Sequence, residues 1–160
     1  MRKLLSFLFL SMIWSNVSFA FALHNLHGVE EFELSVFHEN SCGDMDFSEE
    51  LSINAKYLIG NSKIKLLEAT PEILELSIFT SEGKDTALCA SHIKIRVFSY
   101  GAVPNSVGSE YFHERVSYEK SALAWHFGGT DHVDKHRDAI MRRFDQWIKE
   151  FIIEWNESQK

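Results

Sequence analysis

The chain has 160 residues, of which 45% are hydrophobic and 24% charged, a composition typical of a globular domain. Its 23 acidic residues outnumber 16 basic ones, so the net charge is −7 at pH 7. Phosphate backbones and anionic lipid surfaces repel such a chain, which argues against a nucleic-acid-binding protein.

Residues 1–22 have the pattern of a cleavable signal peptide. Two basic residues precede an apolar run over 4–14. This run is too short for a membrane span of ~20 residues but suits a signal peptide. Ala20 and Ala22 supply the small residues for cleavage before Leu23, and cleavage after Ala20 is a close alternative. An uncleaved amino-terminal anchor is the other interpretation.

Export leaves residues 23–160, which we expect to form a single domain without a transmembrane anchor. Both cysteines, Cys42 and Cys89, lie in this part. An isolated pair in an oxidising compartment usually bridges, so we predict a structural disulfide and a periplasmic or extracellular location. A redox pair is the alternative, but catalytic cysteines typically lie close together as C-x-x-C.

The first half of this domain begins with alternating apolar and polar residues over 29–38, which predicts a half-buried strand. A helix follows, capped by Asp46 or Ser48 and ending at Gly60. A short extended piece is expected over 64–67.

The second half is predicted to be mostly extended. The expected strands cover 72–80, 92–100, 111–118 and 122–127. The last two are either separate or one long strand bent near Lys120. Residues 101–108 contain Pro104 and Asn105 and are expected to form a loop.

The last element is a helix from Asp131 to about Trp155, because apolar residues recur there every three or four positions. Residues 156–160 are expected to fray. The order β-α-β-β-β-β-α predicts an α+β fold, with a small antiparallel or mixed β-sheet, two helices on one face and a long C-terminal helix.

This layout resembles a loosely defined set of small exported bacterial proteins with a β-α-β-β-β-α core and no assigned function. The matching features are the helix, glycine and short strand over 51–67, the strand around Leu76, Trp125-x-x-Gly128, and Phe151-Ile152 followed by Asn156. The resemblance implies a fold and brings no catalytic motif with it. A more distant likeness, at fold level, is to accessory modules of envelope assembly and transport.

One group of residues has the chemistry of a metal site: His126, Asp131, His132 and His136. His132 and His136 are four apart on the predicted helix, and His126 precedes them on a strand, so three donors for Zn²⁺ or Cu²⁺ could meet. The alternative is that Asp131 caps the helix, His132 is solvated and His136 packs as a hydrogen-bonded core residue.

The sequence argues against an enzyme. It contains no Gly-x-Ser-x-Gly elbow, no phosphate-binding glycine loop and no dinucleotide fingerprint, so no cofactor is predicted. We therefore expect an uncharacterised exported, non-enzymatic binding or accessory module of the cell envelope. The alternative is a metal-binding protein or metal-dependent enzyme that uses the histidine group.

The partner is expected to be an envelope protein or a small ligand. If the last helix overhangs the sheet, Phe151, Ile152 and Trp155 form an exposed docking surface; otherwise this stripe covers the sheet. A small ligand would occupy a pocket lined by Phe79, Phe98, Trp125 and Phe144, which are otherwise a filled core.

Overall fold

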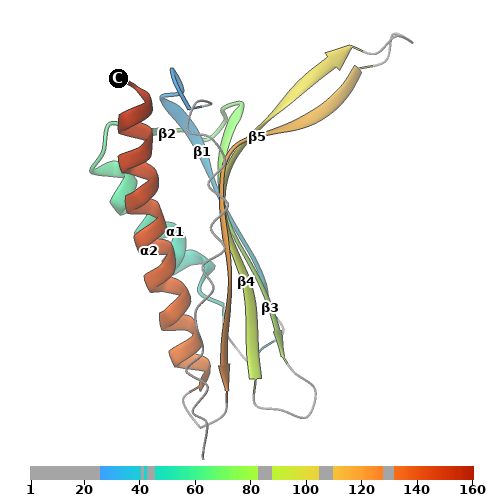
Figure 1. Ribbon diagram of the computed structural model, residues 1–160, viewed down its shortest axis with the longest axis vertical. Coiled ribbons are helices and arrows are strands. Elements are labelled where there is room, and N and C mark those ends of the chain that lie inside the picture. The colour runs from blue at the N-terminus through green and yellow to red at the C-terminus, as the bar shows by residue number, and fades with distance from the viewer. Residues whose placement is uncertain (1–25, 41, 43–45, 83–87, 105–109, 128–131) are drawn as a thin grey trace, which may run out of the picture.

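The computed structural model describes residues 26–40, 42, 46–82, 88–104, 110–127 and 132–160 (Figure 1). The predicted signal peptide, residues 1–22, lies outside the described residues, which begin at Leu26. The elements follow in the predicted order: β1 (Glu31–Asn40), α1 (Ser48–Gly60), β2 (Lys65–Leu66), β3 (Glu72–Glu82), β4 (Leu88–Pro104), β5 (Glu110–Phe127) and α2 (His132–Ser158).

The five strands form one mixed sheet in the order β2-β1-β3-β4-β5. β1 is parallel to both β2 and β3, whereas β3, β4 and β5 are joined antiparallel. Both helices lie on the same face of the sheet (Figure 1). The predicted α+β fold is therefore confirmed, including its long C-terminal helix.

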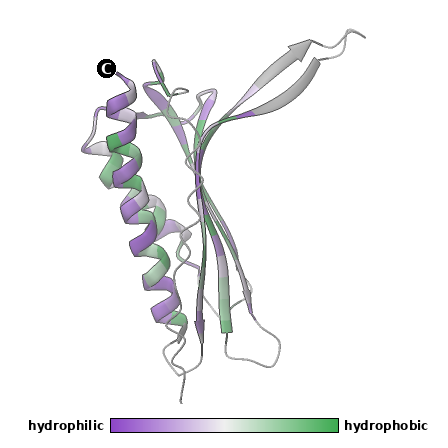
Figure 2. Ribbon diagram, in the orientation of Figure 1, coloured by the Kyte–Doolittle hydropathy of each residue, from purple (hydrophilic) through white to green (hydrophobic). Residues whose placement is uncertain are grey.

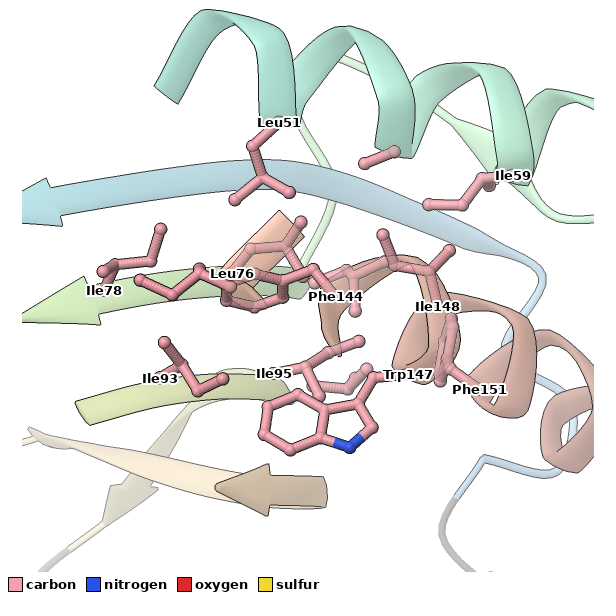
Figure 3. Packing of buried hydrophobic residues seen from close by; sticks show 14 of the residues in the cluster. Leu51, Ile59, Leu76, Ile78, Ile93, Ile95, Phe144, Trp147, Ile148 and Phe151 are labelled. Atoms are coloured by element: carbon pink, nitrogen blue, oxygen red, sulfur yellow. The ribbon is translucent and has the colours of Figure 1, made fainter. Parts of the chain in front are cut away.

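The hydrophobic core lies between the sheet and the helices (Figure 3). Successive residues of a strand point to opposite faces, so every second residue of β3 and β4 reaches the helices. Figure 2 shows hydrophobic and hydrophilic residues interleaved along α2, as expected of a helix with one buried side. The largest fully buried side chains are Phe32, Phe144, Phe151, Leu26, Leu51, Ile59, Leu74, Leu76, Ile78, Ile93, Ile95 and Ile140.

The β4–β5 hairpin extends beyond the rest of the sheet (Figure 1). β3 pairs with β4 only as far as Ser99, and residues 100–104 then pair with 110–114 alone. The loop predicted over 101–108 is therefore too long, because residues 101–104 continue the strand. The remainder, 105–108, lies outside the described residues.

β5 is a single strand, which confirms the alternative of one long strand over the alternative of two, but its irregularity does not lie at Lys120. Lys120 pairs with Ile95 in a continuous ladder, and its ammonium lies 2.8 Å from carboxylate oxygens of Glu150 and Glu154 on α2. The irregularity lies three residues earlier, where a register shift leaves Ser117 without a partner in the ladder. Such a β-bulge adds one residue to one strand and bends it locally.

The carboxyl end of α2 is held against the start of the domain, so the expected fraying of residues 156–160 is wrong. Trp155 Nε1 donates a hydrogen bond of 2.6 Å to the carbonyl of Val29. Gln159 Nε2 donates to the carbonyl of Leu26 at 2.7 Å, and its Oε1 accepts from the Gly28 N–H at 3.0 Å. In the part of the chain that the structure describes, no helix is long and apolar enough to cross a membrane.

Candidate functional site

Cys42 and Cys89 form the predicted disulfide, with their Cα atoms 5.8 Å apart. Cys42 follows β1 and Cys89 lies at the start of β4, so the bridge joins two strands that are separated by β3 in the sheet. Both residues are almost completely buried. A buried bridge across the sheet is typical of a structural disulfide in an extracytoplasmic protein.

A chain of polar side chains crosses the buried side of the sheet beside this disulfide. Thr80 Oγ1 on β3 lies 2.7 Å from Ser91 Oγ on β4, which lies 2.8 Å from Nε2 of His136 on α2. His136 Nδ1 in turn lies 3.3 Å from Nδ1 of His126 on β5. Four elements thus contribute one residue each to a single hydrogen-bonded chain, which we call the polar chain.

Ser91 and His136 have the geometry of a nucleophile and its general base, but the fold shields them. Ser91 is 1% exposed and His136 is fully buried, so no substrate reaches the hydroxyl. The hydrogen bond between them instead helps to satisfy two polar groups that lie in the core. This is the packed, hydrogen-bonded state that the sequence allowed for His136.

The structure brings together two of the four proposed metal ligands, His126 and His136. Asp131 lies outside the described residues, and the structure does not describe the side chain of His132. No three His, Cys, Asp or Glu side chains gather into a metal-binding group within the described ranges. The separation of 3.3 Å between the two Nδ1 atoms is close to that of two ligands at ~2.0–2.1 Å on one tetrahedral ion.

The predicted docking surface at the end of α2 is not exposed. Phe151 is fully buried with its ring 5.7 Å from that of Phe32, and Trp155 is 4% exposed. Ile152 is partly buried against the core. The helix does not overhang the sheet, because β1 and the segment preceding it cover this end.

The proposed ligand pocket between sheet and helices does not form. Of its four predicted lining residues, Phe144 is fully buried in the core between the sheet and the helices, and Phe98 is 3% exposed but lies outside that cluster. Phe79, Phe98 and Trp125 lie on the opposite face of the sheet, since each alternates with a residue that faces the helices.

That opposite face carries a row of exposed side chains across four strands, which sequence analysis did not identify. We call it the apolar row: Phe37 on β1, Phe79 on β3, His92 on β4, and Leu123 and Trp125 on β5. The Phe37 and Phe79 ring centroids are 5.3 Å apart, and His92 stacks on Phe79 at 6.5 Å. Phe37, Phe79, Leu123 and Trp125 are 41–62% exposed.

The sequence contains a pattern that could have identified the apolar row. Phe37 and Phe79 occupy positions where the alternation of their strands calls for polar residues, and such exceptions on adjacent strands can meet. Which exceptions meet depends on strand order and register. Phe79 is directly opposite His92 across β3 and β4, and His92 is directly opposite Leu123.

His38 is a second feature that the sequence did not single out. Its side chain is 2% exposed on the helix side of β1, with Nδ1 3.8 Å from a carboxylate oxygen of Asp46 and its ring against Phe47. Burial lowers the pKa of His38 below its ordinary value of 6.5, although the Asp46 carboxylate opposes this shift. Nε2 has no hydrogen-bond partner among the described atoms.

No protein-family model matches this chain, and no curated protein matches its sequence. Solved structures resemble it distantly. A hypothetical protein from Chlamydia trachomatis shares 12% identity, with 74% of this chain and 96% of that one covered and a TM-score of 0.38. A minor lipoprotein from Acinetobacter baumannii shares 11% identity over 80% and 92%, with a TM-score of 0.37.

The PelC dodecamer from Paraburkholderia phytofirmans shares 8% identity, with coverage of 81% of this chain and 89% of that one and a TM-score of 0.39. The similar structures thus include small bacterial lipoproteins. At these identities and TM-scores the similarity carries no information on what this protein binds or does, so function has to be argued from the residues themselves.

Proposed function

We propose that this protein is an exported, non-enzymatic binding or accessory module of the cell envelope, and that the apolar row is its contact surface. The observation that carries the proposal is the exposure of four large apolar side chains, Phe37, Phe79, Leu123 and Trp125, on one sheet face. The other face of the same sheet is packed against two helices. Contiguous exposed apolar surface of this kind marks interaction sites in soluble domains.

The proposed partner is another envelope protein, because the row runs across four strands. Aromatic side chains dominate the binding energy of protein interfaces, where they lie at the centre of the contact. The buried disulfide and the amino-terminal pattern support export, as both belong to proteins of an oxidising compartment.

Site-specific photo-crosslinking in the native cell tests this surface. A photoreactive residue replaces Phe79, and in a matched control it replaces Tyr57, an aromatic residue of α1 that is 70% exposed. We expect one discrete crosslinked protein from position 79, none from position 57, and loss of the product when Leu123→Ser is added. Absence of a product at position 79, or the same product from both positions, would contradict the proposal.

A metal-binding protein is the second candidate, and the spacing of His126 and His136 favours it. Asp131 and His132 would supply the remaining ligands. Elemental analysis of protein purified without chelator or affinity metal tests this candidate. One Zn²⁺ or Cu²⁺ per chain, lost in the His126→Ala/His132→Ala variant, would support it, and protein free of metal would contradict it. These substitutions leave the buried His136 in place.

A further inference from the structure

A groove of about 310 Å³ runs between β5 and α2, at the edge of the sheet. Its lining residues are Ile93, Ala122, Leu123, Ala124, Ala139, Arg142, Arg143 and Gln146. The volume lies at the lower end of the range for small-molecule sites, ~300–1,000 Å³. A site of this size suits a small ligand better than a helix or strand of a partner protein.

Three alanines leave the groove open. Ala122 and Ala124 occupy helix-facing positions of β5, directly opposite Ile93 and Ser91 of β4. Ala139 lies on α2 above them. Larger helix-facing side chains, such as Leu76 and Ile95, are buried further inside the sheet, whereas the alanines of β5 leave a gap beneath the helix. The floor of the groove is therefore apolar.

Arg142 and Arg143 give this groove a positive rim in a chain whose net charge is −7. Arg143 lies 5.9 Å from the centroid of the Trp147 ring, and Gln146 donates a hydrogen bond of 2.7 Å to Glu150. Arg142 is exposed and forms no ion pair with any side chain that the structure describes. An arginine without a carboxylate partner in so acidic a chain is a ready site for an anionic group.

We propose that this groove binds a small acyl-chain acid, with the chain against the alanine floor and the acidic head group on Arg142. Burial of the chain supplies affinity, and the guanidinium selects for negative charge. This inference goes beyond the apolar row, since it assigns a second site with a different class of ligand.

Isothermal titration calorimetry of the processed, delipidated protein tests the groove, with dodecanoate as the probe. We expect one dodecanoate per chain, and binding weakened about tenfold or more in Arg142→Gln through loss of a charge-assisted hydrogen bond. Dodecanol, which lacks the charge, should bind more weakly by a similar factor. Dodecyl phosphate is compared in parallel; binding of either acid supports the proposal, and the tighter one identifies the head group.

Two further variants test whether dodecanoate binds in the groove itself. Ala139→Leu should abolish binding by filling the groove, while its melting temperature reports that the fold persists. Lys149→Gln is the matched control, because Lys149 lies two turns from Arg142 on the same helix but does not line the groove. The proposal is overturned if neither acid binds, if dodecanol binds as tightly as dodecanoate, or if Lys149→Gln weakens binding as much as Arg142→Gln. None of these outcomes bears on crosslinking at Phe79, so the two proposals fail separately.

Discussion

Ser77 and Ser91 show how the same side chain can have opposite effects at two sites in one sheet. Each is 1% exposed. Ser91 faces the helices, where its hydroxyl lies within hydrogen-bond distance of Thr80 and His136. The hydroxyl of Ser77 has no hydrogen-bond partner among the described atoms. A buried polar group contributes to stability only when it is satisfied.

Replacement of each serine by alanine should therefore have different effects. Ser91→Ala removes the hydroxyl that lies within hydrogen-bond distance of His136 Nε2 and Thr80 Oγ1, and should lower the free energy of unfolding by ~1–3 kcal/mol. Ser77→Ala removes an unsatisfied hydroxyl and should be neutral or slightly stabilising. Urea denaturation of both variants measures the difference. An unchanged free energy of unfolding in Ser91→Ala would show that its hydrogen bonds in the polar chain add nothing to stability.

The buried imidazole of His38 links stability to pH. Its pKa in the folded protein is lowered, so the unfolded state binds the proton more tightly. The stability that neutral His38 contributes is complete above about pH 6.5 and is lost as the pH falls towards the lowered pKa. The free energy of unfolding should therefore decrease between pH 7 and pH 5.

The His38→Asn variant should reduce this decrease, as it removes the titrating group. Urea denaturation at pH 5, 6, 7 and 8 checks the effect. The matched control is His92→Asn, because His92 lies exposed on the other face of the sheet and its replacement should leave the decrease intact. An unchanged pH dependence in His38→Asn would assign the effect to other groups.

Among the elements, those with a regular local pattern were predictable. The apolar spacing of α2 and the alternation of β3 depend only on which residues face the core, so each can be read from its own segment. The length of β4 and β5 could not be read in this way. Residues 101–104 have a sequence typical of a loop, but they pair with β5 as a strand. Lys120 pairs with Ile95, so the ladder continues through this position without a break.

The disulfide connects the end of β1 to the start of β4 across the sheet, and the effect of its removal on stability can be calculated. The two cysteines that it joins are separated by 47 positions in the sequence. In the chain-entropy model, loss of such a bridge lowers the free energy of unfolding by about 4 kcal/mol. Cys42→Ser should show this loss in urea denaturation. The double variant Cys42→Ser/Cys89→Ser should be close to the single variant, since one bridge is lost in both. An unchanged melting temperature in Cys42→Ser would show that the bridge does not stabilise the fold.

At the scale of the whole molecule, the two ends of the domain are joined. Leu26 is fully buried, and its carbonyl accepts a hydrogen bond from Gln159, while the carbonyl of Val29 accepts one from Trp155. Signal cleavage before Leu23 or after Ala20 would preserve these contacts, whereas cleavage beyond Leu26 would remove a core residue. The structure thus sets a limit on where processing can occur.

Processing is measured by intact mass and amino-terminal sequencing of the protein from its native compartment. We expect the mature chain to begin at Leu23, or at Phe21 if the alternative site is used. Replacement of Ala20 and Ala22 by lysine should cause the unprocessed chain to accumulate, because small residues are required before the cleaved bond. A mature protein that retains Met1 would contradict export by cleavage.

The sequence by itself determined the order of the elements, the α+β class and the pairing of the two cysteines. Each of these follows from a local pattern or from a pair without competitors. Only the tertiary structure decided which residues meet. The polar chain joins four elements, the apolar row depends on the register of four strands, and the groove exists because alanines fall on the edge strand beneath α2. Strand order and register are set by long-range packing of the whole core, which no single segment encodes.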